Sequence, residues 1–202
     1  DDWRRVGRID VLGGPDLALR TLSFVTWRCF LLEKLDDRFC RTKAELDVRI
    51  GTLSNSMDAD MRFPVNEIYC YATVWQSAVL QLARLSDVVL LDLRGFDSGN
   101  TGCKLELALL VRHVPLPKVL VLVDRTTDEV ALREVAQHAW RTLPGDSPNA
   151  ASAAPTLQLM AAEGRGAGET VANKLFAMAL GRDSHRGKFA ASTSQTFVDP
   201  EK

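Results

Sequence analysis

Long apolar runs, paired cysteines and an excess of either charge are all missing from this 202-residue chain. No apolar stretch approaches the ~18 residues that a membrane-spanning helix needs, and no signal-peptide pattern opens the chain. The chain has 25 Lys and Arg residues against 26 Asp and Glu residues, which gives a formal net charge of -1. Because there is no basic excess to neutralise phosphates, we expect no nucleic-acid partner.

Cysteine and histidine are too few and too scattered for a disulfide framework or a metal site. The four cysteines form no Cys-x-x-Cys pair, so we interpret them as reduced thiols and expect a cytoplasmic location; they are Cys29, Cys40, Cys70 and Cys103. The three histidines lack ligand spacing, which predicts no metal. A Gly-x-Ser-x-Gly elbow is also missing, which argues against a serine hydrolase.

The length suits one domain with a short tail. We assign 1–180 to a single domain and 181–202, which is polar and poor in large apolar residues, to a disordered tail. The first residue is Asp1 rather than Met, so we expect a piece of a longer protein, with a membrane anchor or partner domain outside the chain left open.

Strand and helix patterns alternate along the chain, which predicts an α/β fold with a mostly parallel, doubly wound sheet of four or five strands. Apolar runs predict strands over 8–12, 88–93, 118–124 and 156–161, of which 88–93 and 118–124 are the strongest. Helical spacing predicts helices over 17–35, 43–50, 71–85, 103–111, 128–140 and 168–180, with Thr126 and Thr127 as caps of the fifth.

The most informative segment runs from a buried strand into a helix. Strand 88–93 is followed by a polar, glycine-bearing loop, 94–102, and then by helix 103–111 with Cys103 and Glu106 on its first turn. In open parallel sheets, ligands bind beyond the carboxyl ends of the strands. A carboxylate at this place is therefore a candidate site residue.

The helix start resembles that of the Toll/interleukin-1 receptor (TIR) domain. Cys103, Glu106 and Leu107 match its Cys-x-x-Glu-Leu pattern, while Gly102 stands where many TIR domains have tryptophan. The resemblance implies a flavodoxin-like or TIR-like fold. It also implies that Glu106 is the catalytic carboxylate of an NAD glycohydrolase, for which NAD is the substrate and no cofactor is needed.

The same segment loosely resembles nucleoside 2-deoxyribosyltransferases, which carry an Asp-Ser-Gly-Thr loop and a Glu-x-Gly-x-Ala helix. The matching residues are Asp97, Ser98, Gly99, Glu106 and Ala108, while Leu107 replaces the usual glycine. Both resemblances assign the central carboxylate to Glu106. Cleavage of an N-glycosidic bond needs such a group near the positive anomeric carbon, and the helix dipole helps to keep it ionised. The alternative is a first-turn glutamate that the helix dipole favours for stability alone.

Each of the other candidate binding residues also has a purely structural interpretation. Asp92 and Asp97 are candidates for binding ribose hydroxyls or are turn residues, and Phe96 is a candidate for stacking on a base or is packed in the loop. Gly13 and Gly14 follow the first strand and either approach a phosphate or form a turn. The candidate substrate-binding residues are Asp92, Phe96, Asp97, Ser98, Cys103, Gly13 and Gly14.

Three functions therefore remain open. The first is NAD glycohydrolase activity, and the second is a TIR-like module that self-associates and signals without chemistry. The third is a domain that senses a nucleotide without cleaving it. In each case we expect a small nucleotide or a second copy of this chain as the partner, so a homo-oligomer is expected.

Overall fold

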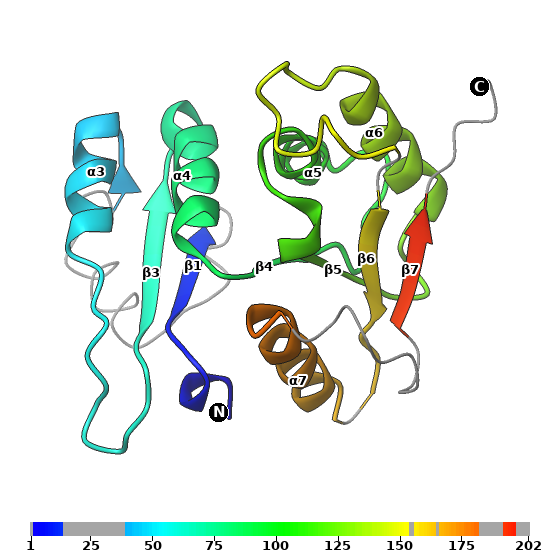
Figure 1. Ribbon diagram of the computed structural model, residues 1–202. Coiled ribbons are helices and arrows are strands. Elements are labelled where there is room, and N and C mark those ends of the chain that lie inside the picture. The colour runs from blue at the N-terminus through cyan, green and yellow to red at the C-terminus, as the bar shows by residue number, and fades with distance from the viewer. Residues whose placement is uncertain (1, 14–38, 154–155, 165, 182–191, 197–202) are drawn as a thin grey trace. The chain divides into compact units, whose positions relative to one another are not determined.

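The computed structural model describes residues 2–13, 39–153, 156–164, 166–181 and 192–196. Parallel strands alternate with helices, so the predicted α/β class is confirmed (Figure 1). The chain divides into two compact units, Asp1–Leu82 and Ala83–Lys202, where the sequence predicts a single domain over 1–180. None of the described helices is both long enough and apolar enough to cross a membrane.

The first unit is built on a three-stranded parallel sheet. Its strands are β1 (Ile9–Gly13), β2 (Phe39–Cys40) and β3 (Val65–Cys70), in the order β1-β3-β2. Two of the described helices follow strands in this unit, α3 (Lys43–Gly51) and α4 (Ala72–Leu85), and a short 3-10 helix, η1, precedes β1 at Asp2–Arg5.

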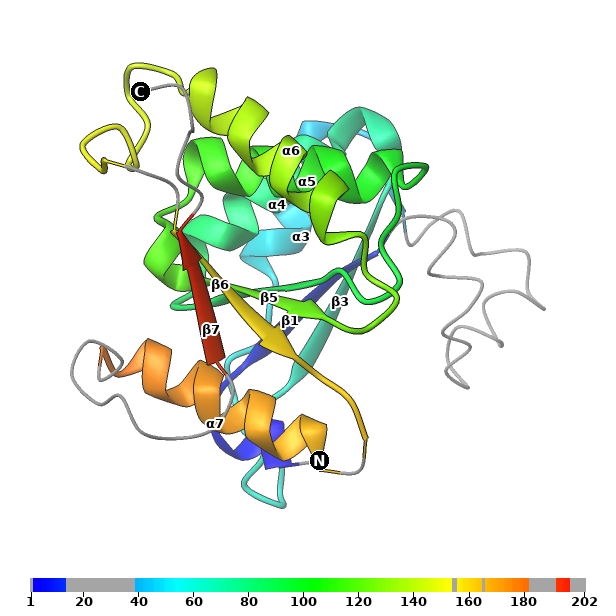
Figure 2. The same ribbon diagram turned by 90° about the vertical axis from the view of Figure 1, so that its right-hand side faces the viewer.

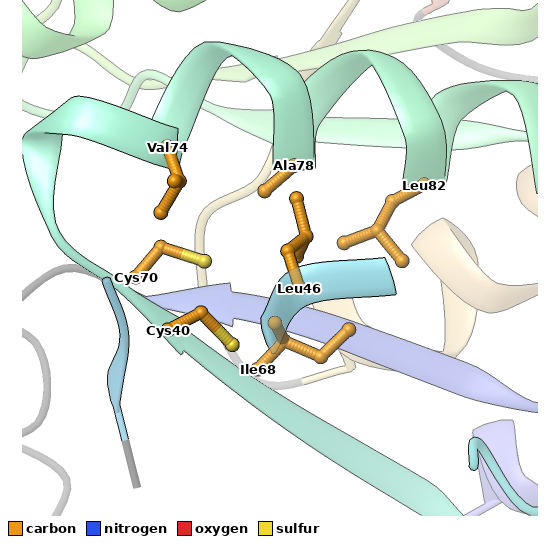
Figure 3. Close-up of a cluster of buried hydrophobic side chains, with 7 residues drawn as sticks. All are labelled: Cys40, Leu46, Ile68, Cys70, Val74, Ala78 and Leu82. Carbon is orange, nitrogen blue, oxygen red and sulfur yellow. The ribbon is translucent and has the colours of Figure 1, made fainter. Parts of the chain in front are cut away.

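A hydrophobic core of the first unit lies between this sheet and helices α3 and α4 (Figure 3). On α4, Val74, Ala78 and Leu82 recur every four residues, so all three face the sheet. Leu46 of α3 reaches the same cluster and is fully buried. The apolar spacing that predicts a helix here therefore also identifies its buried face. The cluster comprises Cys40, Leu46, Ile68, Cys70, Val74, Ala78 and Leu82.

The second unit contains a four-stranded sheet with the order β4-β5-β6-β7. Strands β4 (Val89–Asp92), β5 (Val119–Val123) and β6 (Thr156–Ala161) are parallel, and β7 (Ser192–Thr196) is antiparallel to β6. Every residue of β5 is buried, as expected of a strand with neighbours on both sides and helices on both faces.

Helices cover both faces of this second sheet, so it is doubly wound. Helices α5 (Thr101–His113) and α6 (Glu129–Arg141) lie on one face, and α7 (Ala167–Ala179) lies on the other (Figure 2). The crossovers from β4 through α5 to β5 and from β5 through α6 to β6 step in one direction, which places their helices on the same face. The short 3-10 helix η3 (Leu116–Lys118) precedes β5.

Several boundaries differ from those predicted. Two sheets of three and four strands replace one sheet of four or five, and the central strand β3 was not predicted at all. Within the expected disordered tail, 192–196 forms β7, because its backbone pairs with the edge of β6. The predicted helix over 17–35 lies outside the described residues.

Candidate functional site

The candidate site lies at the carboxyl edge of the second sheet, where β4 and β5 end side by side. Asp92 is the last residue of β4 and is paired in register with Leu122 of β5, and Asp124 follows β5 directly. Because the two strands are parallel, the loops that leave them start from the same edge. Asp92 and Asp124 therefore both lie where doubly wound sheets present their functional residues.

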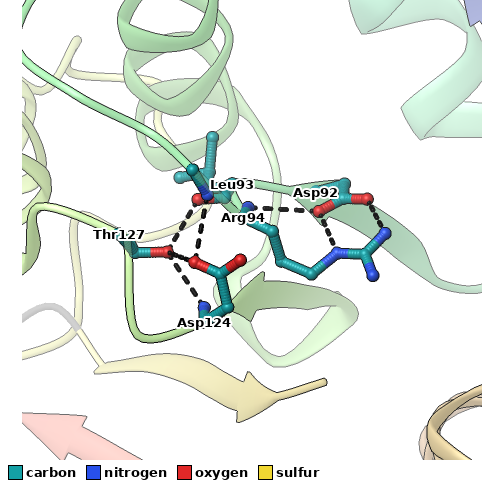
Figure 4. A network of polar contacts seen from close by, with 6 residues as sticks. Asp92, Leu93, Arg94, Asp124 and Thr127 are labelled. Carbon is teal, nitrogen blue, oxygen red and sulfur yellow. Dashed lines mark hydrogen bonds and ion pairs between the residues drawn. The ribbon is translucent and has the colours of Figure 1, made fainter. Parts of the chain in front are cut away.

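Asp92 is held by a guanidinium from its own loop (Figure 4). The Arg94 side chain donates from Nε to Oδ1 at 2.9 Å and from Nη2 to Oδ2 at 2.6 Å, and the Arg94 backbone N–H donates to Oδ1 at 3.1 Å. These hydrogen bonds lower the pKa of Asp92 and raise that of Arg94. Both side chains remain about half exposed, so a polar ligand can compete for either partner.

One carboxylate oxygen of Asp124 accepts hydrogen bonds from the loop after β4 and from the loop after β5. Its Oδ1 accepts from the Thr126 hydroxyl at 2.8 Å, the Thr126 backbone N–H at 3.0 Å and the Gly95 backbone N–H at 3.1 Å. The Thr127 hydroxyl lies 3.2 Å from the same oxygen. With the Thr126 hydroxyl bond as the largest cause, these contacts lower the pKa of Asp124 to about 2. The carboxylate is therefore ionised at every physiological pH.

The loop between β4 and α5 presents its polar side chains to solvent. Asp97 and Ser98 are both exposed. The Asp97 Oδ1 accepts from the Gly99 backbone N–H at 2.6 Å, and the Asp97 backbone N–H donates to Asn100 Oδ1 at 3.0 Å. The first contact is an Asx turn, so the turn interpretation of Asp97 is satisfied, while its exposure leaves it accessible to a ligand.

Phe96 is an anchor of this loop rather than an exposed ring. Only 1% of its surface is exposed, which makes it one of the largest fully buried side chains among the described residues. The prediction that Phe96 stacks on a base or nicotinamide is therefore wrong for this conformation. Loop position alone gave no signal of this burial, since an aromatic residue between polar neighbours fits either role.

Helix α5 begins at Thr101, two residues before the predicted start, with Asn100 as its N-cap. Cys103 is on the first turn as predicted, but Glu106 is on the second, and the first turn holds no acidic residue. The prediction that the helix N-terminus stabilises the charge of Glu106 is therefore wrong, because that effect fades beyond the first turn. Glu106 is half-buried on this helix.

Two carboxylates affect the pKa of the Cys103 thiol at the start of α5. Burial is the main cause that raises the pKa of its thiol, and the carboxylates of Glu106 and Asp92 raise it further. Glu106 and Asp92 are thus both close enough to act electrostatically on one half-buried thiol, although they come from different elements. Cys103 itself is a protonated thiol at neutral pH and a poor nucleophile.

The two glycines that were predicted to bind substrate belong to the first part of the chain. Gly13 is the last residue of β1 in the first unit, and Gly14 lies outside the described residues. Within the described ranges, no group of three or more His, Cys, Asp or Glu side chains is arranged to hold a metal ion.

The loop that begins at Arg94 was predicted to shape the site, but Asp124, Thr126 and Thr127 were not predicted as residues of it. A signal for Asp124 was available, since it directly follows the most apolar strand of the chain, as Asp92 does after β4. The two threonines do not cap α6 as predicted. Asp128 is the N-cap, and its side chain accepts from the Ala131 backbone N–H.

No protein-family model, curated protein or solved structure matches this chain.

Proposed function

We propose that the second unit cleaves the N-glycosidic bond of NAD and releases nicotinamide, with Glu106 as the catalytic carboxylate. The observation that carries the proposal is the position of Glu106, half-buried on α5, the helix that follows the loop from the carboxyl end of β4. The resemblance of the Cys103-x-x-Glu106 helix start to TIR domains supports the same assignment. The unpaired thiols of Cys40, Cys70 and Cys103 support a reducing, cytoplasmic location.

The reaction needs few catalytic groups from the protein. The bond between the ribose C1′ and the nicotinamide nitrogen breaks, the electron pair leaves with neutral nicotinamide, and the sugar becomes oxocarbenium-like. The Glu106 carboxylate stabilises this positive charge or attacks C1′. Water then forms the new C1′–O bond, and its proton passes to solvent.

Three further polar residues, Asp97, Ser98 and Asp92, take supporting roles in this proposal. Asp97 and Ser98 lie exposed on the loop that leads to α5 and accept hydrogen bonds from ribose hydroxyls. Asp92 does the same when the substrate displaces Arg94, whose half-exposed side chain is then free to pair with a phosphate. Cys103 lines the same region as a neutral group.

The test is incubation of the full chain with NAD, followed by chromatography for free nicotinamide, at low and at high protein concentration. The two concentrations matter because we expect self-association to assist activity. We expect release by the parent chain and a loss of roughly 10²–10⁴-fold in Glu106→Gln, which keeps the shape of the side chain and removes its charge. The matched control is Glu134→Gln on α6, where the glutamate is exposed and outside the site.

Two results would contradict the proposal. One is equal turnover by the parent chain and Glu106→Gln. The other is no nicotinamide release at either concentration. If light scattering then shows concentration-dependent assembly that Glu106→Gln leaves intact, the non-catalytic interaction module is the better assignment.

A further inference from the structure

We propose that Asp124 is the positioning residue of the substrate loop, 93–100: it fixes the backbone of this loop from the neighbouring strand end. The inference rests on the proposed function for the identity of the substrate. Asp124 acts through the loop, and it is not assigned a contact with NAD.

The central contact is between Asp124 and Gly95. The Gly95 backbone N–H donates to Asp124 Oδ1 at 3.1 Å, across two loops that are separated by 29 positions in sequence. Gly95 has a φ of +71°, a conformation that side chains other than that of glycine rarely adopt. Thus the loop reverses direction at a residue whose backbone is held directly by the Asp124 carboxylate.

Two more hydrogen bonds tie the same loops together on either side of Gly95. The Thr127 hydroxyl lies 2.9 Å from the Leu93 carbonyl, and the Asp128 backbone N–H donates to the Phe96 carbonyl at 2.8 Å. Asp124 also organises the Thr127 side of this pairing, because its backbone N–H donates to the Thr127 hydroxyl at 3.0 Å (Figure 4). Leu93, Gly95 and Phe96 are therefore all fixed by residues that follow β5.

The charge of Asp124 strengthens this arrangement. The carboxylate is ionised, and hydrogen bonds to a charged acceptor are stronger than those between neutral groups. It also attracts Arg94, whose pKa it helps to raise, so the cation that holds Asp92 feels both carboxylates. One side chain thus influences the backbone of the loop and the charged pair at its start.

The consequence for catalysis follows from the order of the elements. The loop runs from β4 into α5, so its backbone sets where Asp97 and Ser98 present their side chains relative to Glu106. Glu106 itself is held by the hydrogen bonds of α5. Releasing the loop should therefore weaken substrate binding while leaving the catalytic carboxylate in place.

The experiment compares three variants of the full chain: Asp124→Ala, Asp124→Asn and Asp128→Ala. Asp124→Asn retains an oxygen acceptor for Gly95, so it serves as the conservative rescue. Asp128→Ala removes the α6 cap but keeps the backbone N–H that bonds Phe96, so it controls for loss of stability alone. NAD turnover and hydrogen exchange of the 93–100 backbone amides are measured below the unfolding transition of each variant.

We expect kcat/KM for NAD to fall roughly 10²-fold in Asp124→Ala, with the loss in KM rather than kcat. The loop amides should exchange faster in this variant, Asp124→Asn should lie in between, and Asp128→Ala should match the parent chain. Unchanged exchange of the loop in Asp124→Ala overturns the inference whether or not NAD is cleaved. Faster exchange with unchanged KM overturns the link between the loop and the substrate. Faster exchange in Asp124→Ala, together with a parent chain that releases no nicotinamide, refutes the NAD assignment and still supports Asp124 as the residue that holds the loop.

Discussion

The burial of Phe96 makes the sharpest prediction about stability. The ring is 1% exposed, and complete burial of a phenylalanine side chain contributes about 1.5–3 kcal/mol from apolar surface alone. Phe96→Ala also leaves a cavity, so we expect a total loss of about 3–5 kcal/mol in the free energy of unfolding. The two backbone hydrogen bonds of Phe96, to Leu93 and from Asp128, survive in this variant, so the loss measures side-chain packing.

The assay is urea unfolding followed by far-UV circular dichroism. With a slope of about 1–3 kcal/mol per molar urea, the midpoint should fall by roughly 1–5 M in Phe96→Ala. Phe176→Ala is the matched control, since Phe176 lies on α7 with 44% of its surface exposed, and we expect a change within about 1 kcal/mol. A Phe96→Ala chain that unfolds at the parent midpoint but binds NAD more weakly would refute the reasoning and restore the ligand-stacking role.

Three further predictions test other parts of the structure. Leu46→Ala should cost about 2–5 kcal/mol in urea unfolding because Leu46 is fully buried, whereas Val48→Ala, at 69% exposure on the same helix, should change it by under about 0.5 kcal/mol. The pKa of Asp124 is about 2 against an ordinary 3.8, so its ionised carboxylate stabilises the fold above pH 4, and this stabilisation is lost as the pH falls toward 2. In a plot of the urea midpoint against pH, Asp124→Asn should therefore reduce the fall at acidic pH. An unchanged fall would contradict the assignment. Burial and the neighbouring Cys40 raise the pKa of Cys70 to about 12, so iodoacetamide at pH 8 should label Cys70 only after urea is added; rapid labelling of the native chain, read by peptide mass spectrometry, would disprove this.

The sequence predicts the second sheet better than the first because of how the strands are buried. Strand β5 is apolar at every position, which matches its burial on both faces. Strand β3 reads Val-Asn-Glu-Ile-Tyr-Cys, in which Asn66 and Glu67 interrupt the apolar run. Hydrogen bonds accommodate both polar side chains: Asn66 donates to Asp10 on β1, and Glu67 accepts from Tyr69 two residues along the same strand. Because Asn66 depends on a partner 56 positions away, a polar residue at this point of a central strand has no local signature.

The residues of the candidate site also differ in how far the sequence predicts them. Asp92, Asp97 and Glu106 follow from the strand–loop–helix pattern, which correctly places a loop and a helix after β4. The role of Asp124 depends on two loops meeting across the sheet edge, and such pairing is set by the tertiary fold. The start of α5 was missed because Thr101 and Gly102 have weak helical propensity, and the structure nevertheless places them in the first turn.

Strand β7 determines which edge of the second sheet is open to other chains. Strand β6 is paired with β5 on one side and with β7 on the other, so its backbone groups are occupied on both sides. A chain shortened to end before Ser192 would leave one row of N–H and C=O groups of β6 unpaired, beside the buried Leu157 and Leu159. Exposed edges of this kind recruit strands from neighbouring molecules. Expression vectors and fusion partners should therefore retain the chain through Thr196, since trimming the polar end would favour aggregation.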